Sequence, residues 1–354
     1  MAHSSRLPRY LCIAYALLTL YVCLHPFKGW VDSGVHPLGF LLLPWPKYNL
    51  WLDVLLNVLG FMPFGFMFAA ALDERRRVGR AGRIVLLAML ASGLLSFSVE
   101  LLQNFLPTRV ASNLDLATNL LGGVLGALAG LRWGRVFHEG GRVQRWRARH
   151  IPAGHIGEVG ILLIALWWLT QLEPTTTLFG NGDLRVLFDL PAPLAFSARR
   201  YMLLETAIAA CSTLALGLLL MRCLRESSIG MLAVVLTLGL ALRSLADYVF
   251  LVPADPLHWA SVGGLRGLAL GLVLLAVVSR LPRWSQHSLA SLTLLVSTVL
   301  VNLAPDNPYV DASVRTIQEG HFLNFYGLTQ LSAALWPFFA LAYLSAQAAV
   351  TRRY

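Results

Sequence analysis

Apolar residues recur along this chain in stretches of about 20 positions, separated by short polar segments. These stretches lie at residues 9–25, 51–72, 83–105, 113–132, 156–173, 201–221, 229–252, 258–279, 286–304 and 330–350. A helix of about 20 residues is about 30 Å long, which is the thickness of the hydrocarbon core of a bilayer. The pattern therefore predicts an all-α, polytopic transmembrane helix bundle with about ten spans.

The composition agrees with this prediction, because 57% of the residues are hydrophobic and only 13% are charged. A water-soluble core of this size could not bury so much apolar surface, so the surplus faces lipid. The formal net charge of +10 could indicate nucleic acid. The cations, however, lie in short runs between apolar stretches and not on one amphipathic face. We expect a lipid bilayer as the partner and no nucleic acid.

Arginine is distributed unequally between alternate connecting segments. The enriched segments lie before residue 10 and at 75–83, 132–149, 222–225, 280–283 and 352–353, whereas the opposite segments hold few basic residues. Cytoplasmic loops are enriched in Arg and Lys. The asymmetry thus predicts that both termini are cytoplasmic. No small-residue cleavage site follows the first apolar stretch, which indicates an uncleaved first span.

The longest basic segment divides the chain into unequal parts. We predict a four-span membrane domain at residues 1–133, a basic cytoplasmic linker at 134–155 and a six-span membrane domain at 156–354. All four cysteines lie in apolar stretches, so neither a disulfide framework nor a metal site is expected. The chain also lacks a phosphate loop, an HExxH motif and a Ser-His-Asp set, and we expect no cofactor.

Ionisable and carboxamide residues cluster in three front spans, where burying a charge at the helix centre costs about 2.5–3.5 kcal/mol on insertion scales. The second span has Asp53 and Asn57, the third has Glu100 and Gln103, and the fourth has Asp115 and Asn119. Each pair is spaced i,i+3 or i,i+4 and therefore shares one helix face. The predicted topology puts all three pairs near the outer surface.

The short loop PTRVAS adds Arg109 and Ser112 to this group and requires the third and fourth spans to be antiparallel neighbours. In the second span, Pro63 and Gly65 favour a kink that could open an outward-facing cavity. The fourth span contains Gly122, Gly123 and Gly126. Their spacing GGxxGxxxG recurs at 262–271, which indicates either close helix packing or a degenerate duplication.

Two interpretations of the polar cluster are open. It is either a network that only locks three helices together or a binding site. Three carboxylates beside one arginine leave an excess of negative charge in a poorly hydrated place. Protonation, a bound cation or a cationic group of a ligand would relieve that excess, and packing alone does not require it.

Ionisable residues in the later spans and loops have the same two interpretations. Arg243 and Asp247 are spaced i,i+4 and can pair, and Arg266 lies in the next span. An interhelical ion-pair network explains them better than a transport pathway does. His258 and His321 lack metal-ligand spacing and are interpreted as solvated or interfacial.

The stretches LDVLLNVLGFMPFG, SVELLQ and RVASNLDLATNLLGGVLG occur in this order over residues 52–126. As an ordered set they resemble the VanZ-like family of bacterial membrane proteins, which is named for an association with resistance to the glycopeptide teicoplanin. The resemblance implies the bacterial cell envelope and the cytoplasmic membrane, but no established reaction. It implies functional positions at Asp53, Asn57, Pro63, Gly65, Glu100, Gln103, Arg109, Asp115 and Asn119.

Three functions stay open for a protein with these features. The first is a non-enzymatic protein that binds or screens an outer-leaflet component, such as a lipid-linked envelope intermediate or a glycopeptide target. The second is a membrane-embedded enzyme in which a carboxylate acts as general base and Arg109 holds an anionic group. The third is a lipid or ion translocator.

The charge asymmetry generates a topology prediction. Reporter fusions after residues 78, 142 and 354 are expected to report the cytoplasm, because all three sites lie in or next to arginine-rich segments. A periplasmic signal from the fusion at residue 142 would overturn the map.

Overall fold

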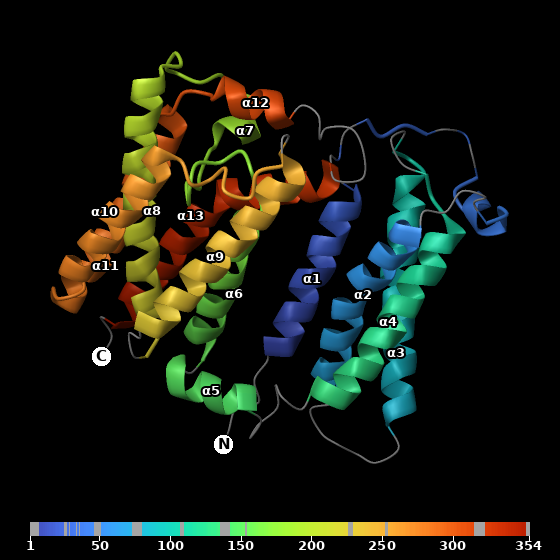
Figure 1. Cartoon of the computed structure of the whole chain (residues 1–354). Coiled ribbons are helices and arrows are strands. Elements are labelled where there is room, and N and C mark those ends of the chain that lie inside the picture. Colours follow the sequence, from blue (N-terminus) through green and yellow to red (C-terminus); the bar gives the residue numbers. More distant parts are fainter. Residues whose placement is uncertain are drawn as a thin grey trace. The chain divides into compact units, whose positions relative to one another are not determined.

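The computed structural model describes residues 7–24, 27, 29–32, 34, 36–45, 51–72, 80–106, 110–134, 142–152, 154–225, 229–251, 254–314 and 323–351. Helices and their connections make up this part of the chain, and it contains no strand. The chain divides into two compact units, residues 1–149 and residues 150–354 (Figure 1). Each unit has its own helix packing and is described separately.

Unit 1 contains four apolar helices and two short elements. They are α1 (Leu7–Leu24), the 3-10 helix η1 (Gly39–Leu42), α2 (Trp51–Leu72), α3 (Ala81–Gln103), α4 (Asn113–Trp133) and most of α5 (Arg142–His150). Helix α5 lies within the segment that the sequence predicts as a linker. In η1, the ring of Phe40 is buried and lies 6.3 Å, between centroids, from Phe97 of α3.

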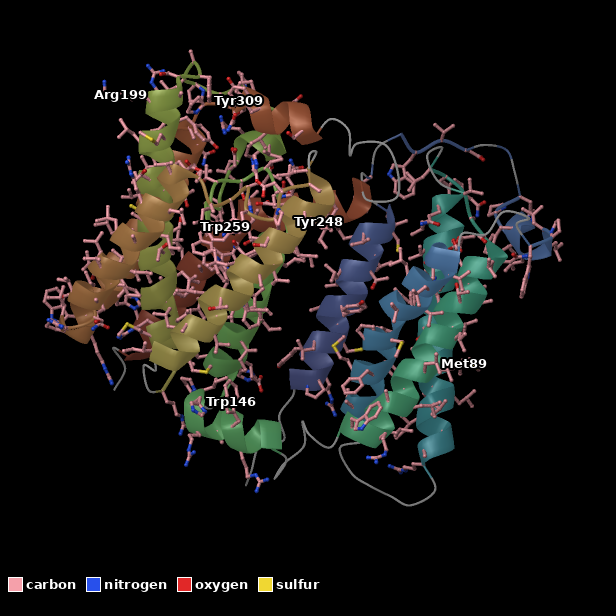
Figure 2. The ribbon with its side chains drawn as sticks, in the orientation of Figure 1. Met89, Trp146, Arg199, Tyr248, Trp259 and Tyr309 are labelled. Carbon is pink, nitrogen blue, oxygen red and sulfur yellow. The ribbon has the colours of Figure 1, made fainter. Side chains whose placement is uncertain are left out.

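Unit 2 is built from six apolar helices with two short helices between them. They are α6 (His155–Thr170), α7 (Arg185–Phe188), α8 (Ala198–Cys223), α9 (Ile229–Phe250), α10 (Val262–Val278), α11 (Arg283–Leu303), α12 (Pro308–Val314) and α13 (Leu323–Thr351). Arg199 at the start of α8 and Tyr309 of α12 lie at the same end of the unit (Figure 2). This end also carries α7 and the irregular segment that follows α6 (Figure 1).

All ten predicted apolar stretches are helical, which confirms an all-α polytopic membrane protein. Seven helices in the described part of the chain are long and apolar enough to cross a membrane, and α1, α6 and α10 are shorter. Many large apolar side chains on these helices are exposed, for example Leu94 of α3 and Val273 of α10. Lipid is the solvent that makes such exposure favourable.

Glycines bring the backbones of α2 and α4 into close contact. A Cβ atom at Gly122 would lie 2.3 Å from the carbonyl oxygen of Val58, and one at Gly126 would lie 2.0 Å from that of Met62. At Gly65 of α2, the same atom would lie 2.0 Å from the carbonyl oxygen of Gly123. Lipid tails are as apolar as leucine, so close van der Waals packing of this kind is a main source of helix association.

In unit 2, α8 is the central helix. In its most apolar stretch 72% of the residues are buried, whereas the corresponding share is 28% in both α9 and α11. Helix α10 packs on it through Gly267 and Gly271, whose added Cβ atoms would lie 2.5 and 2.7 Å from carbonyl oxygens of α8. The two GGxxGxxxG stretches therefore both form close helix–helix contacts. This packing accounts for the shared spacing without a duplication.

Alanine substitution tests the glycine contact in unit 1. Gly126→Ala is expected to destabilise the purified protein by about 1–3 kcal/mol, because the methyl group cannot fit against a rigid helix backbone. Gly60→Ala in α2 is the matched control, since nothing lies within 4 Å of its Cβ position. It should be neutral or slightly stabilising, because alanine favours helix over glycine. Equal thermal midpoints for the two variants in detergent would contradict this packing.

Candidate polar binding site

Helices α2, α3 and α4 carry polar side chains that meet near one end of unit 1. The Asn57 side-chain amide donates a 3.0 Å hydrogen bond to the Asp115 carboxylate and so joins α2 to α4. The backbone N–H of Ser112 donates a 2.9 Å hydrogen bond to the Glu100 carboxylate and joins the start of α4 to α3. At this end of the unit, α4 is therefore hydrogen-bonded both to α2 and to α3.

Ser112 has a second role because it caps α4. Its hydroxyl oxygen accepts hydrogen bonds from the backbone N–H groups of Leu114 and Asp115, at 3.2 and 3.4 Å. Capping of this kind satisfies N–H groups that have no partner within the helix. The cap fixes the helix start, so that the Ser112 N–H points at Glu100 and Asp115 faces Asn57.

The Glu100 carboxyl group lies at the centre of the site. The residue is only 2% exposed and lies close enough to Asp115 for their charges to repel. A buried carboxylate requires compensating donors or cations. The backbone N–H of Ser112 supplies one such donor.

A polar stripe continues from Glu100 along α3. Ser92 and Ser96 precede it at i,i+4 spacing, and both are fully buried. The Asn119 amide donates a 3.0 Å hydrogen bond to the Ser96 hydroxyl. The side-chain oxygen of Asn119 and the Ser92 hydroxyl have no hydrogen-bond partner among the described residues. The stripe from Glu100 to Ser92 covers about 12 Å of helix, so polar groups reach well into the α3–α4 interface.

Other predicted residues lie elsewhere or outside the described side chains. Gln103 donates a 3.0 Å hydrogen bond to the Cys23 carbonyl and joins α3 to α1, so it does not enter the cluster. The side chain of Asp53 and the whole of Arg109 lie outside the described residues. Helix α2 continues through Pro63.

The sequence reasoning missed Ser92, Ser96 and Asn104. The Asn104 amide donates to the carbonyls of Pro37 and Glu100, at 3.0 and 3.1 Å. The two serines could have been found from their i,i+4 spacing to Glu100 on one helix face. Asn104 continues the same i,i+4 spacing, but its contact with Pro37 could not be found from that spacing, because Pro37 lies far away in the sequence.

In unit 2, the Arg243 and Asp247 side chains form an ion pair with a nitrogen–oxygen distance of 3.1 Å. The Arg243 guanidinium also donates to the Glu173, Pro174 and Thr176 carbonyl oxygens, which belong to the segment after α6. This pair anchors a loop to α9. Arg266, in contrast, is exposed on α10.

Unit 1 is therefore a bundle of apolar helices that holds acidic and other polar side chains between its spans. These features define it as part of a membrane protein with a buried polar site. Residues 11–134 match the family described as VanZ/LLP1. This match agrees with the resemblance to the VanZ-like family that the sequence motifs indicate. No curated protein and no solved structure matches the chain.

The two buried serines of α3 generate a paired prediction. Ser92→Ala should leave stability unchanged or raise it by about 1 kcal/mol, because it removes a buried hydroxyl that lacks a partner. Ser96→Ala should lower stability by about 1 kcal/mol, because it leaves the Asn119 amide without its acceptor. Thermal melts of both variants in detergent check this difference. An equal loss in both would show that the Ser92 hydroxyl has a partner of its own.

Proposed function

We propose that this VanZ-like membrane protein binds the polar head group of a lipid-linked envelope component at the outer leaflet of a bacterial cytoplasmic membrane. Both termini lie in the cytoplasm in this proposal, so the polar ends of α2, α3 and α4 face outward. The binding site is the polar cluster around Glu100. By holding or screening such a component, the protein would alter access of a glycopeptide to its target.

The observation that carries the proposal is the buried Glu100 carboxylate beside Asp115. Two acidic side chains lie at this depth, and a cationic or hydroxyl-rich ligand group would compensate their charge and fill their acceptor positions. Asn119, whose amide nitrogen donates to Ser96 of the α3 stripe, also has a side-chain oxygen without a partner among the described residues. Each of these groups gains a partner when a donor-bearing ligand is bound.

A purely structural role explains the cluster less well. The glycine contacts already hold α2 against α4 at backbone distance. Interhelical hydrogen bonds in membranes contribute about 0.6 kcal/mol on average. Neutral serine and asparagine side chains would supply that amount without a buried charge. This comparison supports a role for the two acidic side chains beyond helix association.

The head groups of lipid-linked envelope intermediates have the complementary chemistry. Their sugars and amino groups present many hydroxyl and ammonium donors, whereas ionised carboxylates only accept hydrogen bonds. The lipid portion would remain in the bilayer beside the exposed apolar surfaces of α3 and α4. Binding of this kind needs neither a cofactor nor a covalent step.

Native mass spectrometry of the purified full-length protein tests this function. The parent protein is expected to retain a lipid-linked envelope species, and Glu100→Gln should reduce that retention about tenfold or more, because hydrogen bonds to charged groups contribute about 1.5–3 kcal/mol. Glu158→Gln is the matched control, since Glu158 is a similarly buried glutamate in α6 of unit 2. It should retain the species.

Thermal melts run in parallel separate loss of binding from loss of folding. Glu100→Gln should melt close to the parent, because the isostere keeps the packing. The proposal fails if the parent retains only bulk phospholipid, or if a folded Glu100→Gln variant retains the same species at the same level.

A further inference from the structure

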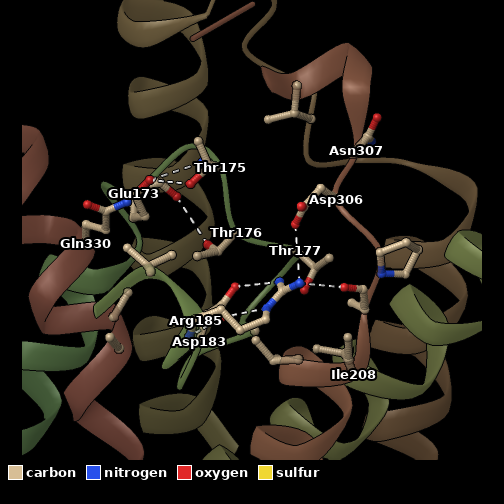
Figure 3. Close-up of a pocket in the computed structure, with 18 of the residues that line it drawn as sticks. Glu173, Thr175, Thr176, Thr177, Asp183, Arg185, Ile208, Asp306, Asn307 and Gln330 are labelled. Carbon is tan, nitrogen blue, oxygen red and sulfur yellow. Dashed lines mark hydrogen bonds and ion pairs between the residues drawn. The ribbon is translucent and has the colours of Figure 1, made fainter. Parts of the chain in front are cut away.

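A cavity of about 210 Å³ opens at the end of unit 2 that carries α7 and α12 (Figure 3). Polar residues from the segment after α6 form one side, and Tyr201 of α8 and Gln330 of α13 contribute to the others. Apolar residues such as Ile208 and Val301 complete the wall. The charge asymmetry of the loops predicts that this end faces outward.

The segment between α6 and α7 forms the cavity with irregular but firmly held backbone. Arg243 binds its carbonyl groups from α9, as described above. From α11, the Asn302 amide donates a hydrogen bond of 2.7 Å to the Gly182 carbonyl and accepts one of 3.0 Å from the Leu184 N–H. The Gly182 N–H donates a hydrogen bond of 2.8 Å to the Ala333 carbonyl of α13. Non-helical backbone among membrane helices is tolerated where it is buried in protein or lines a cavity, and here it is fixed from three helices.

Arg185 cannot serve as an anion receptor in this cavity. The Nε and Nη2 atoms of Arg185 donate hydrogen bonds to the Asp183 carboxylate, at 3.0 and 2.7 Å. Its Nη1 atom donates to the Ala304 carbonyl at 2.9 Å and to Asp306 at 3.3 Å. A guanidinium has five N–H groups, so these contacts leave no free pair for a phosphate or a carboxylate.

The cavity keeps an excess of negative charge. Glu173, Asp183 and Asp306 line it, against the single guanidinium of Arg185. The Glu173 carboxyl group is fully buried and accepts hydrogen bonds from the Thr175 and Thr329 hydroxyls, at 2.5 and 2.9 Å. Even if Glu173 is protonated, two carboxylates face one guanidinium.

We propose that this cavity binds a primary ammonium group, either from a soluble amine or from a lipid head group. An ammonium has three N–H donors and no acceptor. This matches a lining in which the guanidinium is occupied and Asp306, whose side chain is 59% exposed, contacts Arg185 through its Oδ1 atom. Pockets for drug-sized ligands measure about 300–1,000 Å³, so the cavity fits one small group. Tyr201 and the apolar wall contact its methylene groups. This site is separate from the Glu100 cluster and does not depend on it.

Binding of ethanolamine hydrochloride to the purified full-length protein tests the proposal. Ethanolamine should raise the melting temperature, because a ligand of the folded state stabilises it. Ethylene glycol, which is similar in size but uncharged, and inorganic phosphate should not. Asp306→Asn should weaken ethanolamine binding about threefold to tenfold, since the lost charge is partly exposed to solvent. The effect should decrease as salt is added.

Asp255→Asn is the control, because Asp255 is an exposed aspartate outside the cavity. It should bind ethanolamine as the parent does. Nanodiscs that contain phosphatidylethanolamine identify the source. Retention of this lipid by the parent but not by Asp306→Asn assigns the ammonium to a lipid head group, and binding of free ethanolamine alone assigns a soluble amine.

Three results would overturn the proposal. One is the absence of both ethanolamine binding and selective lipid retention. Another is an equal response to ethylene glycol or phosphate. The third is an Asp306→Asn variant that folds like the parent and binds ethanolamine with unchanged affinity.

Discussion

The contact between α2 and α4 determines the geometry of unit 1. Water drives apolar helices together in soluble proteins, but lipid does not, so two membrane helices must associate through close packing or polar contacts. Gly122 and Gly126 of α4 allow its backbone to touch the carbonyl groups of Val58 and Met62 on α2. Helix α4 also packs on α3, where Gly123 meets the Ser92 side chain. Because α2, α3 and α4 are held at these distances, the polar residues at their ends have few partners other than one another.

Both units use irregular or capped backbone to position polar groups beside apolar helices. In unit 1, the Ser112 cap turns a backbone N–H toward Glu100. In unit 2, the segment after α6 is held by Arg243, Asn302 and Ala333 and forms a cavity. Each site combines carboxylates with neutral donors and acceptors, and in the proposed topology each faces outward.

The sequence predicted the helices well, because membrane-spanning segments have a simple requirement of length and apolarity. It also predicted that Asn57 lies near Asp115, since helix-face spacing and the alternating direction of the helices place both near one end of the bundle. Gln103 instead bonds to the Cys23 carbonyl, and no local pattern specifies which neighbouring helix a side chain meets. The cavity in unit 2 was missed because residues 173–185 resemble an ordinary solvated loop in sequence. Their burial depends on Arg243 and Asn302, which are distant along the chain.

The most direct test is cysteine cross-linking between α2 and α4 in native membranes, because the glycine contact is what holds Asn57 beside Asp115. The parent for this test is a variant in which Cys12, Cys23, Cys211 and Cys223 are replaced by alanine. Asn57→Cys with Asp115→Cys in this background is expected to form a disulfide rapidly on mild oxidation. Adding Gly126→Leu should slow the reaction strongly in protein that still inserts, because the leucine forces the two backbones apart. The absence of a cross-link in the first variant, or an unchanged rate in the second, would contradict the account.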